Sequence, residues 1–368
     1  MWEMVDEILQ HEMAAHFAGG GEVEEVVPLR RGHIHSSFVV DVRDGTDVSR
    51  LLLQRINSDV FPDPESVIRN ARQITCHLRQ GMTRWGVEDL ERRVLDPVFA
   101  DGGGDHVRDG DGGWWRAFHF IDGAVPAGAV DEEHVEEAAR AYGQFQLLMA
   151  DYDGPRLALT IPGFHDTPRR LEALESAAAD DPVGRLAEAR REVEAILDRR
   201  DLGRALVDAD LPQRLVHNDA KLDNVLFDTA TGEALCVVDL DTVMPGLVGH
   251  DFGDMVRSMS TLTPEDDAGD EPVEVSEGLF AALAGGYLEA AGGMLDRAEI
   301  ESLVPSGMVS TMEQAARFLT DHLQGDVYFR VHRPGQNLDR ARTQLALLEA
   351  LIDARPRLEE IVARELQS

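Results

Sequence analysis

Short apolar runs separated by turn-forming residues characterise the first third of the chain. The runs are rich in β-branched and aromatic residues, and clusters of Asp and Gly lie between them. They are Ser37–Val42, Arg50–Ile56, Val94–Ala100 and Trp114–Ile121. This pattern predicts a small antiparallel sheet. Two helices are expected in the same part, an amphipathic one near residues 1–17 and one near residues 65–81.

Beyond residue 122, apolar positions recur every three or four residues, which predicts helices. The expected helices span residues 131–152, 168–179, 185–200, 308–324 and 337–354. A β-type island at 214–243 interrupts them, and 261–275 has the acidic, Pro- and Gly-containing character of a surface loop. The whole pattern predicts an α+β fold, with a β-rich lobe over 1–121 and a larger helical lobe over 122–368. A ligand is expected in the cleft between two such lobes.

The composition limits the partners of this protein. The chain has 368 residues, 43% of them hydrophobic, which is enough for two domains with sizeable cores. Asp and Glu number 69 against 35 Lys and Arg, so the formal net charge is −34. This charge repels nucleic acid and anionic membranes, and we expect neither as a partner. A phosphate-bearing substrate needs local cations or a metal ion, and Lys221 is the only lysine in the sequence. The acidity suits either a high-GC genome or a saline cytoplasm.

Cysteine usage and hydropathy indicate the compartment. Cys76 and Cys236 lie far apart in apolar runs, so we expect reduced core thiols. No uncharged apolar run approaches the length of a membrane span, and the N-terminal segment lacks the basic start of a signal peptide. These features predict a soluble, cytoplasmic protein. The sequence carries no indication of an oligomeric state.

The most informative stretch is Leu215–Asp228, with the sequence LVHNDAKLDNVLFD. His217, Asp219 and Asn224 fit the H-x-D-x-x-x-x-N spacing of the catalytic loop of kinases. Phosphoryl transfer needs a carboxylate that orients and deprotonates the acceptor hydroxyl, here Asp219, and an oxygen ligand for the metal on the phosphates, here Asn224. We expect Lys221 to reach the γ-phosphate and neutralise its developing charge. His217 is expected to brace the loop through hydrogen bonds.

Two downstream aspartates are candidates for the second metal ligand. The five residues before Asp239 are continuously apolar, so Asp239 is expected at the end of a buried strand, where a carboxylate is costly unless paired or metal-bound. Asp251-Phe252-Gly253 spells the DFG motif of protein kinases, but no apolar strand leads into it. We therefore assign the metal to Asp239 and expect Asp251 to brace the catalytic loop by binding its backbone. Asp241 is a weaker alternative ligand.

The nucleotide contacts of the small lobe are less definite. Gly32 lies in a segment that either folds over phosphates through its backbone N–H groups or forms an ordinary hairpin. The lysine that kinases usually carry on the following strand is absent, so Gln54 or Arg55 must replace it, and strand alternation lets only one of them face the cleft. We assign Gly32 and Arg55 to nucleotide binding, although Arg55 fits a solvated surface position equally well.

Polar side chains in the helical part offer contacts for a hydroxyl-bearing substrate. Arg317, Tyr328 and His165 are the candidates. Taken singly, each residue type is more typical of a surface or capping position.

Several segments resemble the N-acetylhexosamine 1-kinases, within the aminoglycoside phosphotransferase and choline kinase-like superfamily. They are LVHNDAKLDNVLFD, CVVDLDTVMPGLVGHDFGD and FLTDHLQGDVYFRVHRPGQNLDRARTQLAL, and RRGHIHSSF, LLLQRINSDVFPDP and IPGFHDTPRR extend the resemblance along most of the chain. It implies a bilobal protein-kinase-like fold and ATP-dependent phosphorylation of the anomeric hydroxyl of N-acetylglucosamine or N-acetylgalactosamine. By position, it implies Asp219 as the base, Asn224 and Asp239 as Mg²⁺ ligands, and Arg317 and Tyr328 in the sugar pocket. The missing lysine departs from the wider superfamily.

Two alternatives remain at this point. One is a kinase of the same superfamily for another acceptor: an aminoglycoside, a different free sugar or an amino alcohol. The other is a nucleotide-binding pseudokinase, which the missing lysine suggests. The joint presence of Asp219, Lys221, Asn224 and Asp239 argues against a pseudokinase, because a binding module needs none of that chemistry.

Overall fold

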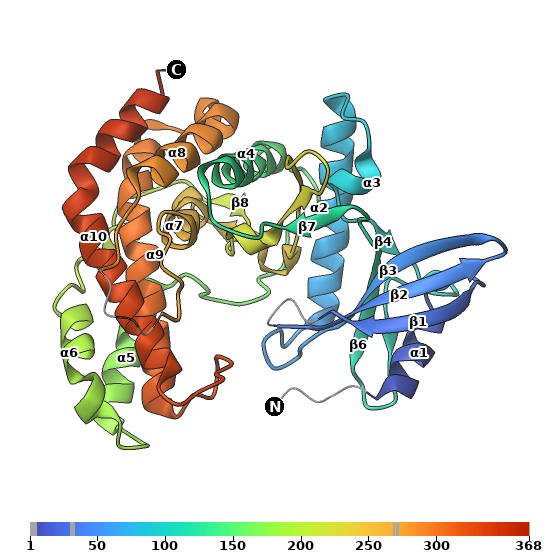
Figure 1. Cartoon of the computed structure of the whole chain (residues 1–368), viewed down its shortest axis with the longest axis horizontal. Helices are drawn as coiled ribbons and strands as arrows, with labels where there is room; N and C mark the ends of the chain where they lie inside the picture. The colour runs from blue at the N-terminus through green and yellow to red at the C-terminus, as the bar shows by residue number, and fades with distance from the viewer. Residues whose placement is uncertain (1–5, 30–33, 268, 270–271, 368) are drawn as a thin grey trace. The chain divides into compact units, whose positions relative to one another are not determined.

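The computed structural model describes residues 6–29, 34–267, 269 and 272–367 (Figure 1). The chain forms two compact units. The first comprises Met1–Ala124, Tyr152–Pro162 and Val238–Val243, and the second comprises Val125–Asp151, Gly163–Val237 and Met244–Ser368. Each unit thus combines three stretches of the chain, whereas the sequence pattern predicted one continuous stretch for each lobe.

An antiparallel sheet forms the framework of the first unit. Its strands follow the order β1-β2-β3-β6-β4, and β5 pairs with β6. They are β1 (Glu22–Pro28), β2 (Ser36–Asp44), β3 (Asp47–Arg55), β4 (Pro97–Val98), β5 (Val107–Arg108) and β6 (Trp114–His119). Because Asp44 pairs directly with Asp47, β2 and β3 are joined by a tight hairpin in which Gly45 has a φ of +62°. The central strands β2, β3 and β6 are those that the apolar runs predicted.

Two helices bury apolar residues of the first unit. Met13 and Phe17, in and just after α1 (Glu7–Ala15), join a core with alternate residues of the sheet such as Val40 and Trp115. The long helix α2 (Pro64–Arg84) is capped at its N-terminus by Asp63, whose side chain accepts a hydrogen bond from the Ser66 N–H. Helix α2 packs against the 3-10 turn η3 (Leu240–Thr242). This packing connects α2 to the segment that carries Asp239.

The first unit also departs from the pattern. Only Pro97–Val98 of the run predicted over residues 94–100 forms a strand, and the short helix α3 (Leu90–Arg93) lies before this run. Strand β1 was not among the apolar runs from which the sheet was predicted. The N-terminal helix is described from Glu7, and residues 1–5 of the expected helix lie outside the described residues. Cys76, expected in the core, is exposed on α2, whereas Cys236 is buried as expected.

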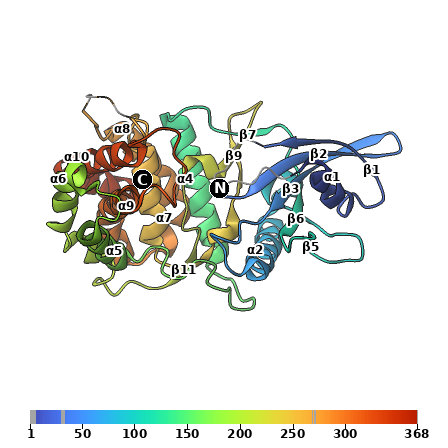
Figure 2. The same ribbon diagram turned by 90° about the horizontal axis from the view of Figure 1, so that it is seen from below.

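Long helices dominate the second unit. They are α4 (Glu132–Met149), α5 (Thr167–Asp180), α6 (Leu186–Leu197), α7 (Val248–Met259), α8 (Glu277–Ala291), α9 (Arg297–Gln324) and α10 (Gln336–Glu365). Short strands and 3-10 turns lie between them: β7 (Ala124–Pro126), η1 (Leu202–Arg204), β8 (Arg214–Val216), η2 (Leu222–Asn224), β9 (Val225–Asp228), β10 (Ala234–Val237), β11 (Met244–Gly246) and η4 (Gly292–Met294). Strands β9 and β10 pair antiparallel, as do β8 and β11. Figure 2 shows α5 and α6 beside α9.

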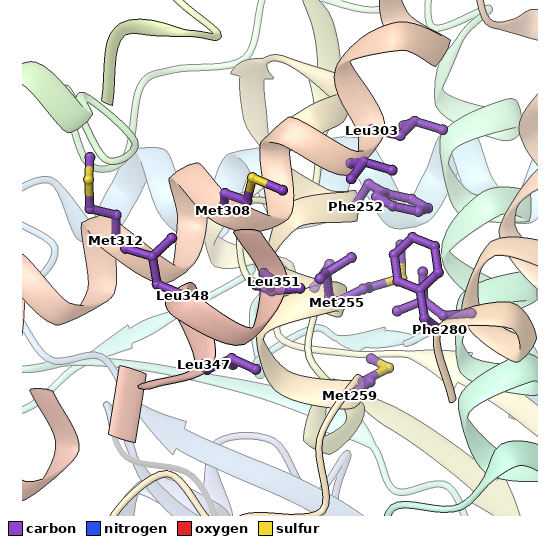
Figure 3. Close-up of a cluster of buried hydrophobic side chains, with 14 of the residues drawn as sticks. Phe252, Met255, Met259, Phe280, Leu303, Met308, Met312, Leu347, Leu348 and Leu351 are labelled. Atoms are coloured by element: carbon purple, nitrogen blue, oxygen red, sulfur yellow. The ribbon is translucent and has the colours of Figure 1, made fainter. Parts of the chain in front are cut away.

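Helix α7 lies at the centre of this helical core. Its residues Phe252, Met255 and Met259 are fully buried against side chains of α8, α9 and α10 (Figure 3). Small residues allow α7 and α9 to approach closely, since a Cβ on Gly253 would lie 2.5 Å from the Ser306 carbonyl oxygen. The glycine of the DFG sequence is therefore required by helix packing.

The helix predictions are only partly right. Helices α7 and α8 were not predicted, because their glycines weaken the periodic signal. Helices α9 and α10 are longer than expected and continue through Pro305 and Pro356. The α+β class with an antiparallel sheet first and helices after it is confirmed. No helix among the described residues is long and apolar enough to cross a membrane.

Candidate active site

Residues 217–224, which the motif predicts to be the catalytic loop, connect β8 to β9 through η2 in the second unit. The Asp219 carboxylate accepts hydrogen bonds from Lys221 Nζ at 2.7 Å and from Asn224 Nδ2 at 2.8 Å. Asn224 Nδ2 also donates to the Asp219 carbonyl oxygen at 2.9 Å. Helix α4 supports the loop, because the Tyr142 hydroxyl donates to the Lys221 carbonyl oxygen. The structure thus brings together three of the residues predicted from the motif.

The environment of Asp219 keeps its carboxyl group ionised. Burial by itself raises the pKa of Asp219, but the Lys221 ammonium and the hydrogen bonds from Lys221 and Asn224 hold it well below its usual range. The side chain retains 20% exposure, so a ligand can reach it. An ionised, oriented and accessible carboxylate is what a hydroxyl acceptor requires.

Asp251 and His217 hold the backbone of the catalytic loop. The Asp251 carboxylate accepts hydrogen bonds from the His217 N–H at 2.8 Å and from the Asn218 N–H at 2.7 Å. His217 is fully buried beside Tyr142 and Phe145, and its Nδ1 accepts a hydrogen bond from the Asp219 N–H at 3.3 Å. Burial raises the pKa of Asp251 even though these hydrogen bonds oppose the shift. These are the contacts that a bracing role requires of both residues.

His165 lies beneath this loop and lines a small pocket together with Glu313 and His250. Its Nδ1 is 2.9 Å from Glu313 Oε1 on α9, and its Nε2 is 2.8 Å from the Asn218 carbonyl oxygen. Both ring nitrogens therefore have protein partners. This geometry differs from the sequence-based expectation of a substrate contact, and Glu313 was not singled out by the sequence at all.

Arg317 and Tyr328 lie together, as their common assignment to a substrate pocket requires. The Arg317 guanidinium is 5.9 Å from the ring centre of Tyr328 and 5.4 Å from that of Phe164, and Tyr328 is 58% exposed. Arg170 adds a second guanidinium, and burial together with the nearby Arg317 charge lowers its pKa. Because Phe164 precedes His165, this cluster lies close to the catalytic loop.

The first unit carries Asp239 on a segment with unusual backbone geometry. Asp239 has a φ of +60°, which non-glycine residues rarely adopt. Two residues later, Asp241 is fully buried and receives hydrogen bonds from Arg116 Nη1 and Nη2, each 2.7 Å long, and from His35 Nε2, also 2.7 Å. Both carboxylate oxygens of Asp241 are therefore already occupied. The structure gives Asp241 an anchoring position instead of the alternative metal-binding one.

The two candidates for the missing lysine have different partners. Gln54 Oε1 accepts hydrogen bonds from Arg116, which lies opposite it on β6. Arg55 Nε donates to Asp109 Oδ2 at 3.1 Å. Asp109 also accepts hydrogen bonds from Trp115 Nε1 and the Gly113 N–H, so it belongs to a structural network. Gly32, assigned to nucleotide binding, lies outside the described residues.

The side chains assigned to the metal have suitable donor chemistry. Asn224 uses its Nδ2 group toward Asp219, which leaves its Oδ1 as the atom for a ligand. Asp239 supplies a carboxylate. Among the described residues, no three His, Cys, Asp or Glu side chains gather as a metal cluster. One amide oxygen and one carboxylate suit Mg²⁺, which is usually bound by few protein groups together with phosphates and water.

Comparison with known proteins identifies the family. Residues 26–300, well over half of the chain, match the family described as "Phosphotransferase enzyme family". The chain belongs to this phosphotransferase family. Its members include small-molecule kinases, so the superfamily to which the motifs pointed is confirmed, and the acceptor of this phosphotransferase is left open.

Solved structures agree with the fold of this phosphotransferase. A microcompartment-associated aminopropanol kinase matches with a TM-score of 0.63 and 16% identity over 96% of this chain and 99% of that one. An aminoglycoside phosphotransferase from Alicyclobacillus acidocaldarius matches with a TM-score of 0.57 and 14% identity, over 95% of this chain and 96% of that one. AMP-bound spectinomycin phosphotransferase matches with a TM-score of 0.59 and 11% identity, over 94% of this chain and 98% of that one. These likenesses confirm the protein-kinase-like fold.

Proposed function

We propose that this phosphotransferase transfers the γ-phosphoryl group of ATP to the anomeric hydroxyl of an N-acetylhexosamine, giving the sugar 1-phosphate and ADP. The observation that carries the proposal is the group of Asp219, Lys221 and Asn224 on one loop, with Arg317 and Tyr328 clustered in the same unit. The narrower sequence resemblance, in the DLDTVMPG, LQGDVYF and RARTQLAL segments, supports the sugar acceptor over others.

The chemistry assigned to the catalytic loop is positioning and proton transfer. The acceptor oxygen attacks the γ-phosphorus, the bond to the bridging β,γ-oxygen breaks, and ADP leaves with that electron pair. Asp219 orients the hydroxyl and takes its proton. The anomeric hydroxyl is more acidic than other sugar hydroxyls, so a carboxylate with a low pKa suffices as acceptor late in the transfer. Lys221 exchanges its bond to Asp219 for one to the γ-phosphate and neutralises charge there.

The nucleotide is assigned from related structures, and the metal is assigned from the side chains that could bind it. Solved spectinomycin phosphotransferase structures contain AMP, or ADP with spectinomycin, which supports a nucleotide co-substrate in this fold. Asn224 and Asp239 would hold Mg²⁺, which supplies charge neutralisation on the phosphates when bound. Arg55 is left out of the proposal because it pairs with Asp109, and His165 is left out because both ring nitrogens have protein partners.

The charge of the candidate substrate cluster favours a neutral acceptor. Several structural neighbours are named as kinases of aminopropanol, ethanolamine or choline, whose acceptors carry a cationic amine. In this chain, Arg317 and Arg170 lie close enough for the first to lower the pKa of the second. Two guanidinium groups beside Tyr328 repel a cationic amine but donate hydrogen bonds to hydroxyl and acetamido oxygens.

A competition assay tests the acceptor. The purified chain is incubated with Mg·ATP and an equimolar mixture of N-acetylglucosamine, N-acetylgalactosamine, glucosamine, aminopropanol, choline and spectinomycin, and the products are separated by mass spectrometry. We expect phosphate on the two N-acetylated sugars. Phosphate on aminopropanol, choline or spectinomycin alone would replace the sugar proposal with the amino-alcohol or aminoglycoside alternative, and phosphate on glucosamine alone would indicate a different free sugar. ATP binding without transfer to any acceptor would indicate a pseudokinase.

A further inference from the structure

Two histidines hold the peptide group that immediately precedes the Asp219 side chain. The carbonyl oxygen of this group, from Asn218, accepts a hydrogen bond from His165 Nε2 at 2.8 Å. Its N–H, from Asp219, donates to His217 Nδ1 at 3.3 Å. Asn218 has a φ of +64°, an unusual conformation that must be maintained by its surroundings. The peptide plane is therefore fixed from both ends.

The partners of His165 determine its protonation. A carbonyl oxygen lies at Nε2 and a carboxylate oxygen of Glu313 lies at Nδ1, and both are acceptors. The ring can satisfy both only as a donor on each nitrogen, which is the imidazolium form. The second oxygen of Glu313 accepts a hydrogen bond from the Thr167 hydroxyl at 2.6 Å, so the carboxylate is also fully engaged. His165 and Glu313 are thus a buried ion pair.

The charged and titratable neighbours of this pair support its ionised state. Burial lowers the pKa of His165, but Glu313, the Asn218 carbonyl and Asp254 outweigh this effect and raise it above 6.5. Burial raises the pKa of Glu313, but His165, Thr167 and Arg317 bring it down to about 2. The His250 ring lies against His165 at a tilt of 36°, with ring centres 4.7 Å apart, and burial and the His165 charge lower the pKa of His250 to about 3. Only one of the two neighbouring rings is therefore charged.

We propose that His165 and Glu313 form a charged positioning pair that fixes the Asn218–Asp219 peptide and so directs the Asp219 carboxylate. The pair does not touch the substrate. A hydrogen bond from a charged donor is stronger than one between neutral groups, and rotation of the peptide would leave a buried imidazolium unsatisfied. The two residues that oppose this rotation lie far apart in the sequence. His165 is 53 positions before Asn218, and Glu313 is 148 positions after His165. The inference rests on the proposed role of Asp219.

Three variants separate this role from a purely structural one. His165→Leu removes the donor to Asn218. Glu313→Gln keeps the shape of the side chain and removes its charge. Its amide N–H₂ can donate to Nδ1 of a neutral His165, and its amide oxygen can accept from the Thr167 hydroxyl, so both hydrogen bonds of Glu313 are kept. Glu188→Gln is the matched control, since Glu188 pairs with a different buried histidine of the same unit, His322, at 3.2 Å.

Kinetics with the acceptor that the wild type uses should show a loss in kcat without a loss in binding. We expect His165→Leu to lower kcat about 10- to 100-fold, with the KM values for ATP and acceptor changed less than threefold. Glu313→Gln should give a smaller kcat loss, and Glu188→Gln none. A rise in acceptor KM at unchanged kcat would overturn the inference and return His165 to the substrate contacts that the sequence suggested.

Two measurements do not depend on turnover. In protein labelled with ¹⁵N-histidine, the His165 ring should carry protons on both nitrogens at pH 7, and Glu313→Gln should leave only one. Hydrogen exchange at the Asp219 amide should accelerate in His165→Leu but not in Glu188→Gln. A singly protonated His165 in the wild type, or unchanged exchange, would overturn the inference even if the chain transferred phosphate. If the wild type transferred no phosphate, only the proposed function would fail, and these two results would still decide the positioning role.

Discussion

Arg116 donates two hydrogen bonds to the Asp241 carboxylate, one to each oxygen and each 2.7 Å long. Arg116 lies on β6, and Asp241 lies two residues after the proposed metal ligand Asp239. The Asp241 carbonyl oxygen also accepts a hydrogen bond from the Thr160 hydroxyl at 2.7 Å. The segment that carries Asp239 is therefore anchored to the sheet of the first unit by a buried, bidentate ion pair.

Arg116→Met should destabilise the first unit strongly, because it leaves the buried Asp241 carboxylate with His35 alone. Removing one partner of a buried ion pair costs about 3–5 kcal/mol. The measurement is urea or thermal unfolding followed by tryptophan fluorescence, since Trp115 lies in the core of this unit. Arg43→Met is the control, because the Arg43–Glu24 pair is exposed to solvent, where an ion pair contributes little to stability. Equal effects of the two substitutions would contradict the anchoring role.

Asp251 and Asp239 should respond differently to isosteric substitution. Asp251→Asn places an amide N–H₂ group against the backbone N–H of His217 or Asn218, and two donors cannot bond to each other. We therefore expect the folded state to lose roughly 1–3 kcal/mol of stability. The kcat should fall, while the Mg²⁺ requirement should stay unchanged. Asp239→Asn keeps a residue that tolerates positive φ, so the fold should persist while turnover is lost. The measurements are melting curves and a Mg²⁺ titration of initial rates. A Mg²⁺ requirement altered by Asp251→Asn would return the metal to the DFG aspartate.

The ion pair of His165 and Glu313 should give the second unit a characteristic pH dependence. The pKa of Glu313 is lowered to about 2, so its contribution is present above its unfolded value near 4.5 and is lost as pH falls toward 2. The pKa of His165 is raised, so its contribution is present below 6.5 and is lost as pH rises through the folded value. The difference in melting temperature between wild type and Glu313→Gln should therefore be largest between about pH 4.5 and 6.5. A difference independent of pH would show that the pair is not ionised.

Tyr328→Ala should weaken acceptor binding without affecting the fold, because this ring is largely exposed and contacts Arg317. We expect the KM for the sugar to rise about tenfold, which corresponds to about 1.4 kcal/mol, while the KM for ATP stays constant. Trp85→Ala is a matched control, since Trp85 is an exposed aromatic residue of the first unit. A change in the ATP KM alone would remove Tyr328 from the substrate contacts.

Local sequence patterns determine some features of the candidate site and not others. The spacing of His217, Asp219 and Asn224 is local, and the hydrogen bonds among their side chains and backbone follow from it. Glu313 and Arg116 were not predicted, because their partners lie 148 and 125 positions away and no short motif contains both members.

Helix α7 shows why a local reading of sequence fails in the core. Its sequence VGHDFGDMVRSM contains two glycines, which favour a loop when read locally. The structure uses one of them, Gly253, for the close approach to Ser306 on α9, and tertiary packing outweighs the low helix propensity. His165 shows the same limit, because its two hydrogen-bond partners, Glu313 and the Asn218 carbonyl oxygen, lie 148 and 53 positions away in the sequence.

Phosphorus NMR of the reaction product tests the central claim most directly. The chain is incubated with Mg·ATP and N-acetylglucosamine or N-acetylgalactosamine, in parallel with Asp219→Asn, whose ATP binding is checked by calorimetry. We expect an anomeric sugar phosphate and ADP from the wild type, and retained ATP binding with most turnover lost in the variant. A sugar phosphate at another position, or equal turnover by Asp219→Asn, would contradict it.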